Sequence, residues 1–194
     1  IAHRNTRRLV ALVNQMLDLQ KIEAGAVEFE LRPVPIGPLL VEALEDNRAY
    51  AAGFGVLIAL EGDPPEVALQ ADPERLLQVL TNLLCNAARF SPAGETVAVG
   101  TSRARGWVKV AVRDRGPGIP DEFRPRVFQK FAQAEASSGA REGSGLGLSI
   151  SKSIIERLGG RIGFETQLGR GSTFHFELPE WRQDAGTARD GGEG

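Results

Sequence analysis

Residues 72–92 read DPERLLQVLTNLLCNAARFSP and have the marks of one amphipathic helix with defined ends. Asp72 can accept a hydrogen bond from the first free backbone N–H groups, and Pro73 suits the first turn. Ser91 and Pro92 end the helix. Its apolar side consists of Leu76, Leu77, Leu80, Leu83, Leu84 and Ala87. The helix is therefore expected to pack by this side against the core and to expose the other.

The polar side of this helix carries two amides and a guanidinium at helical spacing. Asn82 and Asn86 are four residues apart, and Arg89 follows Asn86 by three. Residues at these spacings lie above one another on a helix, so the three groups can converge on one ligand. Amide oxygens suit Mg²⁺, and a guanidinium suits phosphate. Taken alone, the pattern is more typical of a polar helix face that simply meets water.

The segments on either side of this helix predict further helices and strands that pair through hairpins. Residues 96–102 and 108–112 alternate apolar and polar residues about an Arg105-Gly106 turn, which predicts an antiparallel hairpin. The other expected elements are a strand over 56–60, a hairpin of 162–164 with 173–178, and helices over 37–52, 121–128 and 146–158. Because no βαβ crossover is indicated, we expect an α+β fold. It would be a two-layer α/β sandwich with one mixed sheet, covered by helices on one face.

The two ends of the chain differ from this core in composition. A separate N-terminal helix is expected over 6–23, from the helical spacing of Leu9, Leu12, Val13, Met16 and Leu19. A short strand is expected over 27–31, after which three prolines, Pro33, Pro35 and Pro38, should break any regular ladder. Residues 133–144 are polar and small, as in a mobile lid. The chain thus divides into a helix (1–25), a core domain (26–180) and a disordered tail or linker (181–194).

The amino-acid composition of the chain argues against several classes of function, among them nucleic-acid binding and membrane spanning. Of the 194 residues, 42% are hydrophobic and 25% charged, as in an ordinary soluble globular protein. The formal net charge of −2 provides no field that would attract a polyanion, so nucleic acid is not an expected partner. No apolar run approaches the roughly 20 residues that cross a bilayer, and Cys85 is expected to be a packing residue. We therefore expect a location in the reducing cytoplasm, without membrane contact by this segment.

Three glycine-containing stretches follow in the second half of the chain. Residues 114–120, DRGPGIP, come directly after a strand, where Asp114 can accept a hydrogen bond from an amino group such as that of adenine. Residues 143–150, GSGLGLSI, open a helix whose free N–H groups favour phosphate, without forming a Walker loop or a dinucleotide fingerprint. Residues 169–174, GRGSTF, lead into the last strand, where Thr173 can share hydrogen bonds with Asp114. The first and last stretches are also common turn sequences.

In this order and with these spacings, the four stretches resemble the N box and the three glycine boxes of histidine kinases. Residues 128–131, FQKF, resemble the F box of the same family, and the similarity runs from about Ala24 to Pro179. The preceding segment, with RNTRRL at 4–9 and MLDLQKIEAG at 16–25, resembles the second helix of the dimerisation hairpin. The resemblance implies the Bergerat ATP-binding fold of the GHKL superfamily, preceded by part of the histidine-bearing dimerisation domain.

The resemblance also implies roles for individual residues. Asn86 would hold Mg²⁺, while Asn82 and Arg89 would be catalytic and would face the phosphates of ATP. Asp114 would bind the adenine amino group, assisted by Thr173. The remaining ATP-binding positions would be Phe90, Gly116, Gly118 and Ile119 at the base, Lys130 and Phe131 of the F box, and Gly143, Ser144, Gly145, Leu146, Gly147 and Leu148 around the triphosphate.

The activity implied is transfer of the γ-phosphoryl group of ATP to a histidine on the missing dimerisation helix, for onward transfer to the receiver domain of a response regulator. The related gyrase, mismatch-repair and chaperone ATPases carry a glutamate where this chain has Asn82. An amide cannot act as a general base toward water, so a water-using ATPase is disfavoured. The other alternative is a nucleotide-gated interaction module, which closes its lid on ATP without transferring phosphate.

Neither histidine of the chain fits the role of acceptor. His3 is followed by Arg4 where the family has an acidic residue, and Arg8 stands where it has a proline. His175 alternates with phenylalanines on a strand, so it is expected to be a solvated surface residue. The N-terminal helix is expected either to pair with another copy in a homodimer or to fold back on its own domain.

Overall fold

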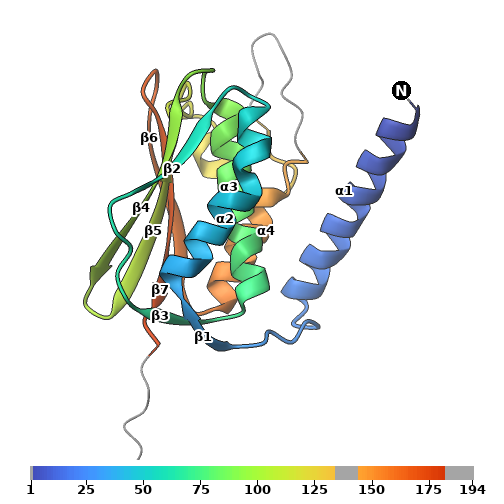
Figure 1. The fold of residues 1–194 in the computed structure, drawn as a ribbon. Coiled ribbons are helices and arrows are strands. Elements are labelled where there is room, and N and C mark those ends of the chain that lie inside the picture. Colours follow the sequence, from blue (N-terminus) through green and yellow to red (C-terminus); the bar gives the residue numbers. More distant parts are fainter. Residues whose placement is uncertain (1, 134–143, 182–194) are drawn as a thin grey trace, which may run out of the picture.

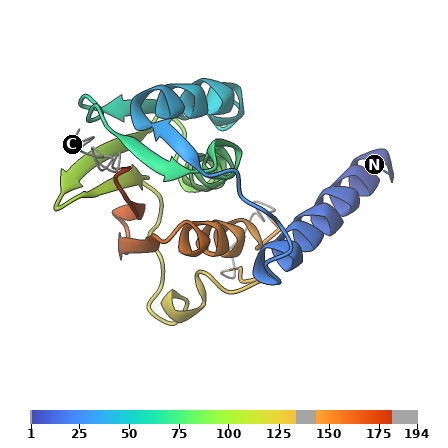
Figure 2. The same cartoon turned by 90° about the horizontal axis from the view of Figure 1, so that it is seen from below.

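In the computed structural model, which describes residues 2–133 and 144–181, a five-stranded sheet is covered on one face by three helices (Figures 1 and 2). In chain order the elements are α1 (Ala2–Glu23), β1 (Arg32–Pro35), α2 (Ile36–Ala52), β2 (Leu57–Glu61), β3 (Ala68–Ala71), α3 (Pro73–Phe90), β4 (Thr96–Ala104), β5 (Trp107–Arg113), the 3₁₀ turn η1 (Arg124–Arg126), α4 (Gly147–Arg157), β6 (Arg161–Gln167) and β7 (Gly171–Pro179). The strand order is β2-β4-β5-β7-β6; β2 and β4 are parallel and the other pairs antiparallel. The expected α+β sandwich with a mixed sheet and an N-terminal helix is confirmed.

The core lies between this sheet and the helices α2, α3 and α4. The side chain of Asp72 caps α3 by accepting from the N–H of Arg75 at 3.2 Å, as the sequence predicts. The apolar side of α3 buries Leu76, Val79, Leu80, Leu83, Leu84, Ala87 and Ala88. Opposite them lie inward-facing residues of the strands, among them Val97, Val99, Val108, Val110, Val112, Phe176 and Leu178. Each large apolar side chain buried here contributes about 1.5–3 kcal/mol, so the polar residues of α3 are held on a rigid support.

The expectations of a strand over 27–31 and of an unpaired stretch at Pro33 and Pro35 were wrong, whereas the helix expected over 37–52 forms as α2. No strand forms over 27–31; β1 begins at Arg32, contains Pro33 and Pro35, and pairs with β3, a strand that was not predicted. The N–H of Ile36 donates to the carbonyl oxygen of Val67, so every second N–H of β1 points toward β3. Pro33 and Pro35, which have no N–H, stand at the positions in between, where the N–H would point toward the open edge. Pro38 lies in the first turn of α2, where a proline is tolerated.

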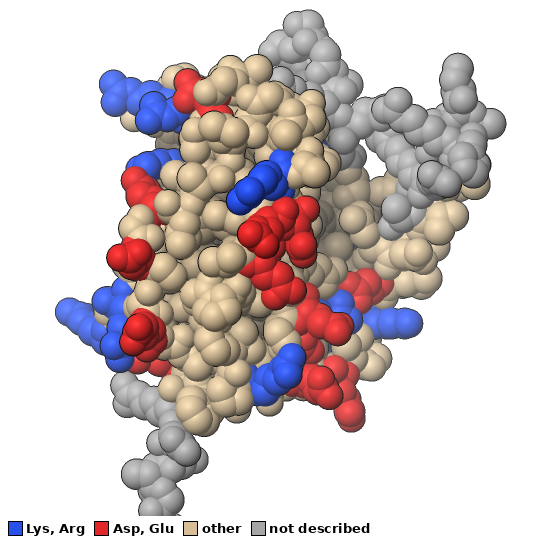
Figure 3. Space-filling view, in the orientation of Figure 1, with Lys and Arg blue, Asp and Glu red and all other residues tan. Residues whose placement is uncertain are grey.

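Other differences concern the second half of the chain. The helix expected over 121–128 is reduced to the single turn η1, which contains Pro125. The expected lid and tail fall largely on residues 134–143 and 182–194, which lie outside the described residues. Figure 3 shows that the face it draws carries both acidic and basic side chains, with several acidic ones gathered near its middle. Within 2–133 and 144–181, none of the helices has the length and apolar character needed to cross a membrane.

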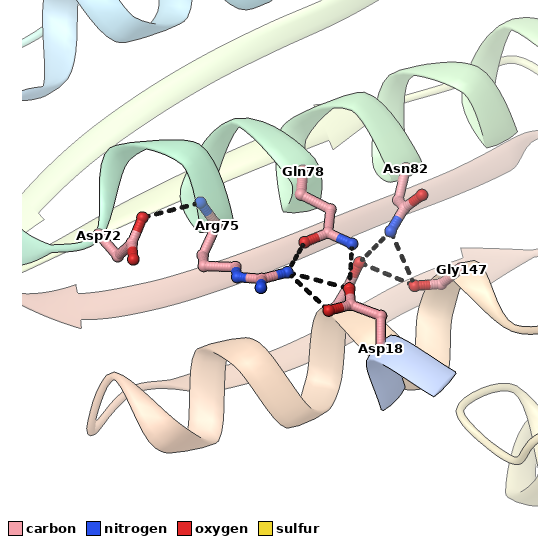
Figure 4. A network of polar contacts seen from close by, with 7 residues as sticks. Asp18, Asp72, Arg75, Gln78, Asn82 and Gly147 are labelled. Atoms are coloured by element: carbon pink, nitrogen blue, oxygen red, sulfur yellow. Dashed lines mark hydrogen bonds and ion pairs between the residues drawn. The ribbon is translucent and has the colours of Figure 1, made fainter. Parts of the chain in front are cut away.

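The two halves of α1 differ in their contacts. The C-terminal half packs on the domain near α4, where Leu19 and Ile22 are buried, and Asp18 accepts hydrogen bonds from Arg75 and Gln78 of α3 (Figure 4). The N-terminal half projects away from the domain (Figure 2). An exposed apolar stripe, consisting of Leu9, Val10, Val13, Met16 and Leu17, runs from this half into the C-terminal half. The expectation that the helix folds back is therefore met for its C-terminal end, and pairing of the exposed stripe with another copy stays a prediction.

The Asp18→Asn variant is expected to loosen the docking of α1 without unfolding the domain. It removes the charge that Arg75 contacts at 2.9 Å, in a pair whose side chains are only 23% and 25% exposed. A loss of about 1 kcal/mol should raise amide hydrogen exchange at Leu19 and Ile22 by about fivefold. The control Glu156→Gln breaks an exposed pair with Lys152 and should leave this exchange unchanged. Equal exchange in wild type and Asp18→Asn would show that the contact does not hold α1.

Candidate functional site

Three of the predicted stretches meet along α3. The loop after β5 touches the end of α3, since a Cβ added at Gly116 would lie 2.9 Å from the carbonyl oxygen of Phe90. The start of α4 touches the middle of the same helix, since a Cβ at Gly147 would lie 3.3 Å from Oδ1 of Asn82. A side chain at Gly116 would force the backbone to shift, whereas one at Gly147 would require only a small displacement of the Asn82 amide. Two glycine boxes therefore each contact the N-box helix, one at its C-terminal end and one at its middle.

Asp114 is the buried acid of this region. Only 6% of its surface is exposed, and its Oδ1 accepts hydrogen bonds from the N–H groups of Gly116 at 2.8 Å and Ser172 at 3.1 Å. Burial raises the pKa of the Asp114 carboxyl, and these two N–H groups oppose the rise. Among the described residues both bonds end on Oδ1, so the lone pairs of Oδ2 are available there to a further donor, which suits recognition of an amino group.

Asn82 joins the N box to the beginning of α4. Its Nδ2 donates to the carbonyl oxygen of Gly147 at 3.1 Å and to Oγ of Ser151 at 3.3 Å (Figure 4). The first turn of α4 has no side-chain cap, so its N–H groups point beyond the helix end with a partial positive charge. An uncapped helix end fixed beside the N box is suited to an anionic ligand.

The remaining N-box residues lie toward the C-terminal end of α3. Asn86 and Arg89 are partly buried and Phe90 is exposed. Nη2 of Arg89 donates to the hydroxyl of Tyr50 on α2 at 3.3 Å, a contact that the sequence did not indicate. The guanidinium is thus turned along the α2 side of the site.

The side chains present fit a magnesium ion that arrives with a nucleotide. Among residues 2–133 and 144–181, no three His, Cys, Asp or Glu side chains gather so as to hold a metal ion. Asn86 can contribute one amide oxygen from α3. Mg²⁺ commonly keeps several water ligands and takes others from substrate phosphates, so one protein oxygen is compatible with a metal bound as Mg·ATP.

The F box contacts both the glycine-rich stretch and α1. The N–H of Phe131, at φ 60°, donates to the carbonyl oxygen of Gly145 at 2.9 Å, and a Cβ at Gly145 would lie 2.8 Å from the backbone of Phe131. Lys130 pairs with Glu23 at the end of α1 at 2.7 Å. The ring of Phe128 packs against Phe164. The structure therefore places Lys130 against α1 and Phe131 against the described part of the glycine box.

The position of Thr173 corrects one expectation. The hydrogen bonds to Asp114 from the last glycine box come from Ser172, whose N–H donates to Oδ1, and not from Thr173. Backbone N–H groups of successive strand residues point toward alternate neighbouring strands, so the N–H of Ser172 points toward the end of β5 and Asp114, and that of Thr173 points toward β6. The sequence placed the contact one residue too far along the strand.

Two other expectations can be compared with the structure. His175 lies on the outer side of the sheet but is not simply solvated: it covers Gly163, its Nδ1 is buried, and burial lowers the pKa of its imidazole. Of the residues expected around the triphosphate, Ser144, Gly145, Leu146, Gly147 and Leu148 are described, with the side chain of Leu146 in the core. Gly143 lies outside the described residues.

The chain is similar to known proteins over most of its length. Residues 71–182 match the family model described as "Histidine kinase-, DNA gyrase B-, and HSP90-like ATPase". The signal transduction histidine-protein kinase BarA of Escherichia coli (strain K12) is 36% identical over 182 residues, which are 90% of this chain and 20% of BarA. The chain spans about one fifth to one quarter of the length of the curated relatives that it matches.

Two solved structures extend this similarity to three dimensions. Full-length ShkA in complex with AMPPNP has a TM-score of 0.80 and 35% identity, covering 91% of this chain and 36% of that chain. The catalytic domain of histidine kinase ThkA, in a nucleotide-free form, has a TM-score of 0.66 and 28% identity, covering 78% of this chain and 97% of that domain. The likeness to ThkA therefore extends over almost the whole of a catalytic domain.

Proposed function

Because the chain belongs to the family of histidine kinase-, DNA gyrase B- and HSP90-like ATPases, we propose that it binds Mg·ATP and donates the γ-phosphoryl group to a protein histidine. The observation that carries the proposal is the environment of Asp114. This buried carboxyl has one oxygen held by two backbone N–H groups and its other oxygen available. The polar side of α3 and the uncapped start of α4 lie at the same end of the domain.

The adenine base would bind between the end of α3 and the loop 114–120. Oδ2 of Asp114 would accept a hydrogen bond from the adenine amino group, while Gly116, Gly118 and Ile119 line the base and Phe90 packs near it. The loop is held by the N–H of Ile119, which donates to Oγ1 of Thr166 at 2.9 Å. A base with a carbonyl in place of the amino group, as in GTP, would present an acceptor to the carboxylate and should bind weakly.

The triphosphate would lie between α3 and the beginning of α4. The N–H groups of Gly147 and Leu148 at the start of α4 and the guanidinium of Arg89 would bind its oxygens, with Ser144, Gly145 and Leu146 beside them. Asn82 would keep α4 in place through its bond to Gly147. Asn86 would hold Mg²⁺, which neutralises phosphate charge as phosphoryl transfer begins.

Transfer to histidine is favoured over hydrolysis by the chemistry at Asn82. Both of its Nδ2 contacts use the amide as a donor, and an amide has no basicity with which to activate water at neutral pH. The acceptor would be a histidine of a dimerisation helix in the intact protein, and the phosphoryl group would pass on to a receiver domain. The exposed apolar stripe of α1 would pair with a second copy in a homodimer.

The proposal is tested by a transfer assay with γ-labelled Mg·ATP. A longer segment of the same protein that includes the preceding dimerisation helix should acquire label in an acid-labile, alkali-stable form, as expected of phosphohistidine. The present chain alone should release inorganic phosphate only slowly. Fast release by the chain alone would support a water-using ATPase. Binding of Mg·ATP without any transfer would support a nucleotide-gated interaction module.

A further inference from the structure

We propose that Thr166 of β6 is a positioning residue for nucleotide recognition: its hydroxyl fastens the loop 114–120 to the β6–β7 turn and thereby fixes Asp114. The inference rests on the proposed binding of adenine by Asp114. Thr166 stands in a strand, outside all the motifs of the sequence, and would itself touch no part of the nucleotide.

The hydroxyl of Thr166 is fully used within the protein. Oγ1 accepts from the N–H of Ile119 at 2.9 Å, lies 2.9 Å from Oγ of Ser172 and donates to the carbonyl oxygen of Gly171 at 3.2 Å. With its proton on Gly171, the hydroxyl accepts from both Ile119 and Ser172. One donor and two lone pairs thus have one partner each.

The two segments that Thr166 joins approach each other backbone to backbone. The N–H of Gly169 donates to the carbonyl oxygen of Pro117 at 2.8 Å. A Cβ at Gly118, where φ is +76°, would overlap the carbonyl of Gln167, and one at Gly171, where φ is +105°, would overlap the carbonyl of Asp114. There is no room for side chains between the loop and the turn, so displacement of one displaces the other.

The β6–β7 turn is also hydrogen-bonded to Asp114, whose carboxyl would bind the adenine base. The N–H of Ser172 donates to Oδ1 of Asp114 at 3.1 Å, and the N–H of Asp114 donates to the carbonyl oxygen of Ser172 at 2.8 Å. The hydroxyl of Thr166 therefore acts on Asp114 through Ser172. The other oxygen of Asp114, Oδ2, would accept the hydrogen bond from adenine. Loss of the hydroxyl should let the carboxyl and the loop shift together.

Thr166→Val is the direct test, because valine keeps the branched shape suited to a strand and removes only the hydroxyl. Thr166→Ser restores the hydroxyl and serves as the rescue. We expect Thr166→Val to bind Mg·ATP about tenfold more weakly, from the loss of acceptors for two donors, and Thr166→Ser to bind within about twofold of wild type. Binding of magnesium triphosphate without a base should be equal in all three proteins, because Thr166 lies away from the phosphate region.

The outcomes separate a positioning role from a structural one. Equal weakening of ATP and triphosphate binding, or unchanged ATP binding in a folded Thr166→Val protein, would overturn the inference. In an Asp114→Asn background, Thr166→Val should cause no further loss of ATP affinity. If Thr166→Val does not fold, Thr166→Cys, with a weaker acceptor, replaces it. Absence of Mg·ATP binding by wild type would refute the proposed function itself, and the role of Thr166 with it.

Discussion

The Asp114→Asn variant is expected to bind Mg·ATP about 100-fold more weakly than wild type, since a hydrogen bond to a buried charged group is replaced by an unfavourable contact. The N–H groups of Gly116 and Ser172 would hold the amide oxygen in the place of Oδ1. The amide NH₂ would then stand where Oδ2 faces the ligand, and two donors would meet at the adenine amino group. Isothermal titration calorimetry with Mg·ATP measures this loss.

The same variant should be at least as stable as wild type at neutral pH without nucleotide. Burial raises the pKa of Asp114 in the folded state. A carboxyl with a raised folded pKa stabilises the protein fully below its unfolded pKa, and this stabilisation is lost as the pH rises through the folded value. The free energy of unfolding of wild type relative to Asp114→Asn should therefore fall between acidic and neutral pH, as measured in urea. A variant that is destabilised at neutral pH would contradict this expectation.

Wild-type affinity for Mg·ATP in a folded Asp114→Asn protein would place the adenine pocket elsewhere. Selectivity gives a second readout, because the amide could donate to the carbonyl of guanine. The preference for ATP over GTP should therefore shrink in Asp114→Asn. An unchanged preference would mean that Asp114 does not contact the base.

The Asn86→Ala variant is expected to lose phosphoryl transfer by about 100-fold or more, because the metal that neutralises phosphate charge loses its protein ligand. Nucleotide binding measured in EDTA should be unchanged, since the adenine contacts do not involve Asn86. Transfer is measured with γ-labelled ATP on the protein extended by its histidine-bearing helix. Asn86→Asp, which keeps an oxygen ligand, should retain most of the magnesium-dependent binding. Equal losses with and without magnesium would exclude Asn86 as the metal ligand.

Local patterns in the sequence were sufficient to predict the main layers of the fold. The apolar residues of α3 recur at helical spacing, and the hairpin of β4 and β5 alternates about Arg105-Gly106, so both could be predicted from short windows. β1 and β3 could not, because each has four residues and β1 contains two prolines. The pairing of β1 with β3 depends on which N–H groups of β1 point toward this distant strand. No local sequence pattern determines that.

The residues of the candidate site also divide into those that the sequence could predict and those that it could not. Asn82, Asn86 and Asp114 stand in short motifs and could be named from the sequence. The contact of Ser172 with Asp114 depends on which neighbouring strand each backbone N–H of β7 points toward, and the sequence alone assigned the contact to Thr173. Thr166 and Tyr50 lie in unremarkable strand and helix sequence, and only the packing of distant segments brings them to the site.

The most direct test is a titration of Mg·ATP into the unmodified chain, followed by thermal unfolding. Binding to the native state should stabilise the protein by about 2.7 kcal/mol at 100 times the dissociation constant. For a chain of this size, that raises the midpoint of unfolding by about 5–10 °C. We expect a saturable rise with Mg·ATP and a much smaller one with Mg·GTP. No rise at millimolar Mg·ATP, or equal rises with the two nucleotides, would contradict an adenine nucleotide site at Asp114.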